Sequence, residues 1–209
     1  MKVVIFDMDG TLLDSKKDIT ISVNYIREKH YGLEPLSEEF IVDVINMEVR
    51  NLPKLFYGTE VYEDRDRELF EVHYENQCIQ NPYLYDGIKE TLEELVASSV
   101  KISVATNAPT PFAKRMLSHL GVDVMFDVII GADKVKNSKP DPQMLNHILK
   151  YYKYDGKKDI AWMVGDNSKD MLSAKAAGIE SMFATWGFTP ESDHKIVVYE
   201  PKEILGIVL

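Results

Sequence analysis

Short apolar runs alternate with longer, periodically apolar stretches over much of this 209-residue chain. Residues 3–6 read Val-Val-Ile-Phe, and such a run predicts a strand buried on both faces, where every side chain is apolar. Stretches with apolar residues every three or four positions predict helices. In chain order these patterns predict helix 88–96, strand 101–105, helix 112–120, strand 128–130, helix 144–151, strand 160–164 and helix 171–177, with strand candidates at 181–184 and 196–198.

The alternation of strands and helices with short connections is typical of a parallel sheet whose right-handed crossovers cover both faces. Residues 15–84 differ, because they show helical spacing and no convincing strand; the spaced residues are Ile19, Val23, Ile26, Leu69 and Val72. We therefore expect an α/β core of residues 1–14 and 85–209, interrupted by a helical domain of residues 15–84. Two sequential domains would separate the first strand from its sheet.

The amino-acid composition and the net charge favour some classes of protein over others. The chain is 45% hydrophobic and 28% charged, as in a folded globular protein, and its 24 basic and 34 acidic residues give a net charge of −10. This balance disfavours binding to the phosphate backbone of nucleic acids. Cys78 is the single cysteine, which excludes an internal disulfide. No apolar run approaches the ~18 residues of a membrane span, and the short apolar N-terminus does not resemble a signal peptide, so we expect a cytoplasmic protein.

The first candidate catalytic or ligand-binding residues follow the first predicted strand. Asp7 follows the apolar run directly, Asp9 stands two residues later, and Gly10 and Thr11 come next. In open parallel sheets, ligands bind beyond the carboxyl ends of the strands. Two carboxylates there indicate metal binding, phosphate binding or proton transfer, whereas the alternative is an ordinary turn, in which Asp and Gly are also common.

Two other strand ends carry polar residues with a choice of interpretations. Thr106 and Asn107 follow strand 101–105 and precede a helix, where they suit either an anion site or an ordinary cap and turn. Lys139 follows strand 128–130. A lone lysine is usually solvated surface, but here it also suits the cation that a carboxylate cluster needs.

The strand 160–164 leads to Gly165 and Asp166, and Asp170 follows four residues later. If the helix has begun, Asp166 and Asp170 share one face; otherwise Asp170 simply favours the helix dipole. With Asp7 and Asp9, up to four negative charges would meet a single lysine, and a phosphate would be repelled unless a divalent cation joined the site. All these candidate ligands are oxygens and the five histidines are scattered, so Mg²⁺ is preferred over zinc.

Four ordered motifs resemble those of the haloacid dehalogenase superfamily. They are Asp7-Met8-Asp9-Gly10-Thr11, Thr106-Asn107, Lys139-Pro140 and Gly165-Asp166-Asn167-Ser168-Lys169-Asp170. The resemblance implies a Rossmann-like, doubly wound, mostly parallel sheet with residues 15–84 as an inserted helical cap. The insert is similar to the cap of the phosphoglycolate phosphatase and β-phosphoglucomutase branch, and Trp186-Gly187-Phe188 most resembles the phosphatases.

This resemblance implies a Mg²⁺-dependent phosphatase that hydrolyses a small phosphorylated metabolite. Asp7 would attack phosphorus to form an aspartyl-phosphate, and Asp9 would protonate the leaving oxygen and later activate water. Lys139 would steady the nucleophile and the transferring group. The implied substrate contacts are Thr106, Asn107 and Gly10, and the implied metal ligands are Asp7, Asp9 through its backbone carbonyl, Asp166 and Asp170, the last by ligation or by orienting water and Lys139.

Two other functions use similar residues. A phosphosugar mutase of the β-phosphoglucomutase kind places an arginine in the cap loop, and Arg50 falls close to that position, where it suits either a substrate contact or solvated surface. However, the glycine of that cap loop is absent. A non-enzymatic phospho-acceptor domain is the remote alternative, because its acceptor aspartate belongs to the third strand and Asp7 follows the first.

Overall fold

The computed structural model describes residues 1–47, 51–190 and 192–209. The chain divides into two compact units, one formed by Met1–Asp14 with Tyr83–Leu209 and the other by Ser15–Pro82. The second boundary lies two residues before the expected position. Tyr83–Leu84 (β3) belongs to the first unit because it pairs antiparallel with Leu13–Asp14 (β2), and sequence periodicity cannot detect so short a strand.

The first unit is built on a six-stranded sheet with the order β5-β4-β1-β6-β7-β8, in which every neighbouring pair is parallel. Its strands are β1 (Lys2–Phe6), β4 (Lys101–Thr106), β5 (Val128–Gly131), β6 (Ile160–Gly165), β7 (Glu180–Ala184) and β8 (Val197–Val198). The chain builds outward from β1 on one side and then, after β5, on the other. The doubly wound parallel sheet is therefore confirmed.

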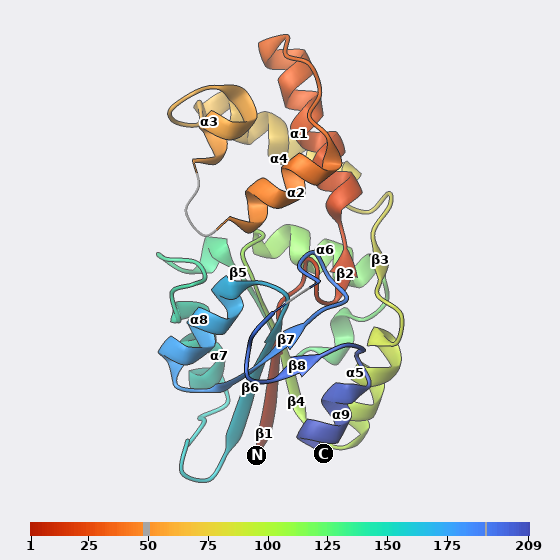
Figure 1. Cartoon of the computed structure of the whole chain (residues 1–209), viewed down its shortest axis with the longest axis vertical. Helices are drawn as coiled ribbons and strands as arrows, with labels where there is room; N and C mark the ends of the chain where they lie inside the picture. The colour runs from red at the N-terminus through yellow and green to blue at the C-terminus, as the bar shows by residue number, and fades with distance from the viewer. Residues whose placement is uncertain (48–50, 191) are drawn as a thin grey trace. The chain divides into compact units, whose positions relative to one another are not determined.

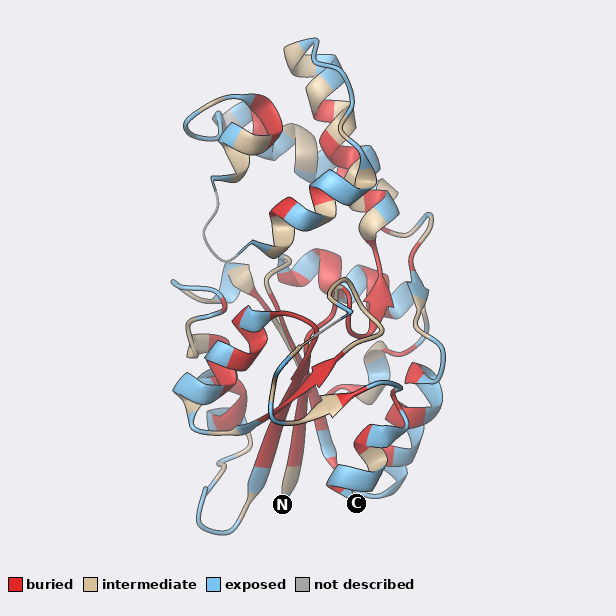
Figure 2. Cartoon of the chain, viewed as in Figure 1, coloured by how far each residue is buried: buried red, intermediate tan, exposed pale blue. Residues whose placement is uncertain are grey.

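Helices cover both faces of this sheet (Figure 1). They are α5 (Ile88–Ala97), α6 (Thr110–His119), α7 (Gln143–Tyr151), α8 (Ser168–Ala177) and α9 (Glu203–Val208), with short 3-10 helices at Asp123–Met125 and Ala132–Lys134. On one face α7 packs Met144 and Ile148 against Val3 and Ile5 of β1. On the other, α5 contacts both β4 and α9, a helix that the sequence patterns did not predict. The four central strands, β1, β4, β6 and β7, are buried at every position after the first (Figure 2), as expected of parallel strands covered on both faces.

The register of the sheet places the predicted site residues together at the carboxyl ends of neighbouring strands. Phe6 of β1 is paired with Val104 of β4 and with Val164 of β6. Asp7 therefore leaves β1 at the same edge where Thr106 and Asp166 leave the two neighbouring strands. This edge is formed by the carboxyl ends of the parallel strands, where ligands bind in open α/β sheets.

The second unit is helical, as predicted. It contains α1 (Lys16–Tyr31), α2 (Glu38–Asn46), α3 (Leu52–Tyr57) and α4 (Asp64–Gln77). Val23 and Ile26 of α1 pack against Ile41 of α2 and Phe56 of α3 in its core.

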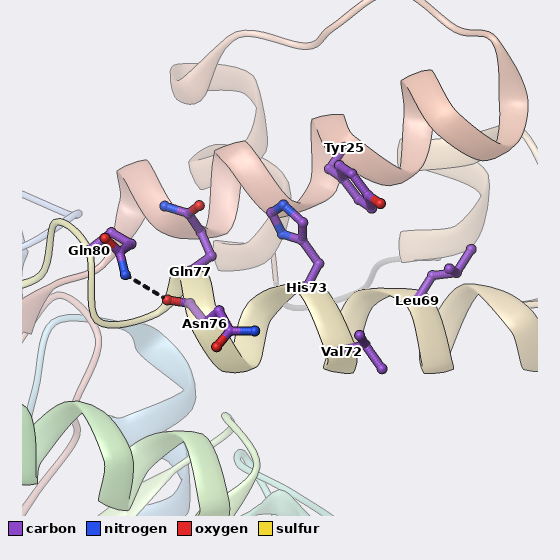
Figure 3. A pocket seen from close by; sticks show the side chains of 7 residues that line it. All are labelled: Tyr25, Leu69, Val72, His73, Asn76, Gln77 and Gln80. Atoms are coloured by element: carbon purple, nitrogen blue, oxygen red, sulfur yellow. Dashed lines mark hydrogen bonds between the residues drawn. The ribbon is translucent and has the colours of Figure 1, made fainter.

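One residue of the predicted apolar spacing does not face this core. Val72 of α4 is 63% exposed. It borders a cavity of about 460 Å³ between α1 and α4 that Tyr25, Leu69, Val72, His73, Asn76, Gln77 and Gln80 line (Figure 3). Among the described residues, no helix combines the length and the apolar character needed to cross a lipid bilayer.

Candidate active site

Asp7 is delivered by the central strand of the sheet. Its backbone N–H still donates to the carbonyl of Val164, at 2.8 Å, and the chain then turns sharply, with the N–H of Leu12 donating to the carbonyl of Met8 at 2.9 Å. Its carboxylate is largely buried. The segment is therefore a turn, as the simpler interpretation held, but one that carries an aspartate into a buried position.

Three of the predicted carboxylates form a cluster. Asp7, Asp166 and Asp170 each place an oxygen such that these atoms lie within 4.8 Å of one another. The condition under which Asp166 and Asp170 would share a helix face is not met, because α8 begins only at Ser168 and Asp170 lies in its first turn. Instead, Asn167 caps the helix and its N–H donates to Asp170 Oδ2 at 3.2 Å, which folds Asp170 back toward the strand end.

Two glycines allow this crowding. A side chain at Gly165 would collide with the Asp170 carboxylate, and one at Gly10 would collide with that of Asp166. Gly10 also has a φ of +83°, a conformation that other residues adopt at a cost. At Gly165 the side chain that occupies the available space is that of Asp170, four residues after its neighbour Asp166.

Lys139 is a buried residue, only 4% exposed, rather than part of the solvated surface. Its ammonium group lies between two carboxylates and donates to Asp7 Oδ1 at 2.7 Å and to Asp170 Oδ1 at 2.6 Å. The lysine thus supplies positive charge within the carboxylate cluster, as the charge count required.

The side chain of Asn107 is hydrogen-bonded to the main chain of Lys139. Asn107 Nδ2 donates to the Lys139 carbonyl at 3.0 Å, and the Lys139 N–H donates to Asn107 Oδ1 at 3.0 Å. The neighbouring Thr106 is buried, and its hydroxyl oxygen accepts from the N–H of Ala108 at 3.0 Å, which leaves the hydroxyl proton to be donated elsewhere. Asn107 is therefore engaged in holding Lys139, a use that the motif alone did not suggest.

Residues 4–184 match the family model described as haloacid dehalogenase-like hydrolase. The chain belongs to this family. It is 32% identical over 197 residues to a phosphoglycolate phosphatase of Vibrio parahaemolyticus, covering 90% of this chain and 85% of the relative. It is 28% identical over 217 residues to an N-acetylmuramic acid 6-phosphate phosphatase of Pseudomonas aeruginosa, covering 100% of this chain and 95% of the relative.

The fold is similar to that of solved structures in the same group. A crystal structure described as a predicted phosphoglycolate phosphatase from Haemophilus somnus superposes with a TM-score of 0.82 at 23% identity, covering 99% of this chain and 97% of that one. The resemblance inferred from the four motifs is confirmed, and so is the Rossmann-like fold of this haloacid dehalogenase-like hydrolase.

The protonation behaviour of the cluster reflects its excess of negative charge. Burial and the neighbouring charges of Asp7 and Asp170 raise the pKa of Asp166 well above its ordinary value. Burial and Asp7 raise the pKa of Asp170 to about 6, although Lys139 opposes the shift. Burial alone would lower the pKa of Lys139, but the carboxylates of Asp170 and Asp7 outweigh it and raise that pKa. Lys139 is therefore charged, and its ammonium group is shared between the carboxylates of Asp7 and Asp170.

These carboxylates fit a divalent metal, which phosphatases of this family use. The donor atoms are oxygens from three different segments, and a hard divalent cation prefers oxygen ligands. A 2+ charge would also relieve the repulsion that raises the pKa values of Asp166 and Asp170.

Asp9 and Arg50 are the two remaining predicted site residues. Asp9 is partly exposed in the turn after β1 and forms an isolated bridge with Leu13. It adds to the influences that raise the pKa of Tyr85, after burial, Asp14 and Asp166. Arg50, the residue that favoured a mutase, lies outside the described residues.

Three residues that sequence reasoning did not assign to the site hold Asp166 in place. Thr11 Oγ1 donates to Asp166 Oδ1 at 3.2 Å, and the N–H of Phe188 donates to Asp166 Oδ2 at 2.9 Å. Trp186 Nε1 in turn donates to the Thr11 carbonyl at 2.9 Å. The available signals were Thr11 in the first motif and the tail Trp186-Gly187-Phe188, which was used only to choose a branch of the family.

Proposed function

We propose that this enzyme is a Mg²⁺-dependent phosphatase that hydrolyses small phosphate monoesters through an aspartyl-phosphate on Asp7. The observation that carries the proposal is the buried cluster in which Asp7, at the tip of the central strand, lies 2.7 Å from the Lys139 ammonium and beside two further carboxylates. The relatives from Vibrio and Pseudomonas are both named as phosphatases of small phosphorylated acids or sugars. Phosphoglycolate is therefore the first substrate to test, followed by sugar phosphates.

Asp7, Asp166 and the backbone carbonyl of Asp9 would hold Mg²⁺. When bound, the ion supplies positive charge that lets a phosphate approach a site rich in carboxylates. Asp170 suits the role of orienting Lys139, because its Oδ1 already accepts from the lysine and its Oδ2 from the N–H of Asn167.

The chain's own residues would then carry the reaction. The Asp7 carboxylate attacks phosphorus as the bond to the leaving oxygen breaks, and Asp9 gives that oxygen its proton. Asp9 next takes a proton from the water that attacks the phosphoryl group, which releases phosphate and regenerates Asp7. Lys139 keeps the Asp7 oxygen oriented and offsets charge on the transferring group, and the Thr106 hydroxyl donates to a phosphate oxygen.

The role of Asn107 in this proposal differs from the direct phosphate contact that the family resemblance implied. Its amide forms two hydrogen bonds with the main chain of Lys139, so we assign it to positioning that lysine. Asn107 acts on phosphoryl transfer through Lys139 rather than by touching the substrate.

Release of p-nitrophenol from p-nitrophenyl phosphate, with and without Mg²⁺, tests the reaction. We expect Mg²⁺-dependent turnover that Asp7→Asn lowers by at least ~10³-fold, because loss of a covalent nucleophile removes the intermediate. Asp193→Asn, an exposed aspartate of the same unit, is the matched control and should retain activity. Equal rates in wild type and Asp7→Asn would overturn the proposal.

A panel of phosphorylated metabolites then separates the phosphatase from a mutase. Phosphate release from phosphoglycolate or a sugar phosphate supports the phosphatase. Conversion of β-glucose 1-phosphate to glucose 6-phosphate with little free phosphate would support the mutase instead. A long-lived phosphorylated chain without turnover would indicate a phospho-acceptor domain.

A further inference from the structure

A second group of potential metal ligands lies within the helical unit. His30 stands near the end of α1, Glu63 is the N-cap of α4, and Asp66 lies in the first turn of α4. One ligand atom of each, an imidazole nitrogen or a carboxylate oxygen, lies within 4.8 Å of the other two. All three residues belong to the unit Ser15–Pro82 and to no part of the carboxylate cluster around Asp7.

Asp66 has one oxygen fully occupied and one without a hydrogen bond. The residue is only 1% exposed. Its Oδ2 accepts from the Tyr31 hydroxyl at 2.6 Å and from the N–H of Glu63 at 3.1 Å, which fixes the orientation of the carboxylate. Its Oδ1 is buried and has no hydrogen-bond partner. A buried carboxylate oxygen that accepts no hydrogen bond is costly, and its ion-pair contact with His30 Nε2 is long, at 3.4 Å, so this atom is available to a ligand that also contacts His30.

The contacts of His30 with the two carboxylates, one of them a hydrogen bond to Glu63, are long for hydrogen bonds and match the spacing of metal ligands. His30 Nε2 lies 3.4 Å from Asp66 Oδ1 and 3.4 Å from Glu63 Oε2. Good N–H···O hydrogen bonds are shorter, at about 2.7–3.2 Å. In a tetrahedral site with metal–ligand distances of about 2.0–2.1 Å, neighbouring ligand atoms are about 3.3–3.4 Å apart. Both separations from Nε2 therefore equal the edge of a tetrahedral zinc site.

We propose that His30, Glu63 and Asp66 bind Zn²⁺, with water as a fourth ligand. One imidazole and two carboxylates form a donor set that suits zinc, whereas Mg²⁺ and Ca²⁺ take six or more oxygens. The Glu63 side chain is 58% exposed, so the ion can enter from solvent, while Tyr31 orients Asp66 from behind. The ion would join the end of α1 to the start of α4.

The alternative is a purely structural role, in which Glu63 and Asp66 form a capping box and His30 lies nearby. Glu63 and Asp66 do cap α4 reciprocally, which by itself explains the contact of Asp66 Oδ2 with the Glu63 N–H. It does not explain why the buried Asp66 Oδ1 accepts no hydrogen bond, nor why His30 Nε2 stays 3.4 Å from both carboxylates. The two interpretations differ in one measurable respect, because only the zinc site binds a metal through an imidazole.

Metal titration of the full chain tests the proposal. The chain should carry Asp7→Asn, because this substitution weakens metal binding by the carboxylate cluster around Asp7. We expect one tightly held Zn²⁺ per chain, and Co²⁺ should give the intense visible absorption of a tetrahedral ion. His30→Gln and Glu63→Gln should each weaken Zn²⁺ binding by more than ~10–100-fold, since even loss of an outer-shell partner has that effect. The matched controls His119→Gln and Glu60→Gln remove an exposed histidine and an exposed glutamate, and should leave the affinity unchanged.

Two results would overturn the site. One is an unmutated cluster that shows no tetrahedral Co²⁺ absorption. The other is Zn²⁺ affinity that is the same in His30→Gln as in its parent. If the variants do not fold, zinc-edge X-ray absorption of the Asp7→Asn parent decides the question. An imidazole in the ligand shell supports the site, whereas a shell of oxygens alone contradicts it, because the cluster around Asp7 offers only carboxylates.

Discussion

Replacing Asn107 by alanine tests whether this side chain positions Lys139. The substitution removes two hydrogen bonds of 3.0 Å and leaves the Lys139 N–H and carbonyl without their partners. A typical hydrogen bond contributes about 1 kcal/mol net, so the free energy of unfolding should fall by about 2 kcal/mol. For a chain of this size, that loss corresponds to a decrease in Tm of roughly 4–8 °C.

The effect on catalysis should fall on kcat. The Lys139 ammonium lies 2.7 Å from Asp7, and a displaced lysine would leave the nucleophile poorly oriented. Misplacement of a catalytic group by about 1 Å can cost about 10²-fold in rate. We therefore expect Asn107→Ala to lower kcat by roughly that factor with a smaller change in KM, as measured with p-nitrophenyl phosphate at saturating Mg²⁺.

The control is Asn137→Ala. Asn137 is an exposed asparagine in the segment that leads to Lys139, and its side chain donates a hydrogen bond of 3.3 Å to Asp141. It should keep both the stability and the kcat of the wild type. If Asn107→Ala left the Tm and kcat unchanged and raised KM alone, Asn107 would contact the substrate directly and the positioning role would be refuted.

Three further predictions concern the cluster and its surroundings. Lys139→Met should lower the free energy of unfolding by about 3 kcal/mol and nearly abolish turnover, because it breaks a buried ion pair with two carboxylates; chemical denaturation and phosphate release measure the two effects. In the metal-free protein, the raised pKa values of Asp166 and Asp170 mean that the folded state binds more protons, so both groups favour folding more as the pH falls, in the case of Asp170 through about 6. Mg²⁺ competes with those protons, and it should therefore raise the Tm more at pH 8 than at pH 5 in a thermal unfolding assay; an equal or opposite dependence would contradict the assignment. Gly187→Ala should cost about 1–3 kcal/mol, because its side chain would collide with the Gly10 carbonyl, whereas Gly206→Ala in α9 meets open space and should stabilise the chain slightly.

The proposed reaction and the proposed zinc site are independent of each other. The first depends on oxygen ligands from Asp7 and Asp166 at the edge of the sheet, and the second on an imidazole within the helical unit. Chelation followed by Mg²⁺ addition should restore phosphatase activity without filling the zinc site. A Zn²⁺-dependent change in the stability of the helical unit would remain measurable in an inactive Asp7→Asn variant.

Much of the fold could be predicted because buried parallel strands have a distinctive sequence. The runs around Val3 and Met163 are apolar at nearly every position, and each became a strand of the sheet. The two-residue strands β2 and β3 and the six-residue helix α9 are too short for any periodicity to show. Val72 kept the helical spacing yet lies at the surface, because spacing identifies a helix face but not what covers it.

Local patterns in the sequence are enough to identify the residue types at the strand ends: aspartates after β1 and β6, a threonine as the last residue of β4 and a lysine ahead of α7. This follows because strand and helix patterns are local, and so is the order of the motifs. Three contacts could be found only from the folded chain: Lys139 is buried between Asp7 and Asp170, Asn107 is hydrogen-bonded to the main chain of Lys139, and the N–H of Phe188 donates to Asp166. Those contacts join segments up to 132 residues apart, and their geometry depends on sheet register and glycine packing, which no local pattern records.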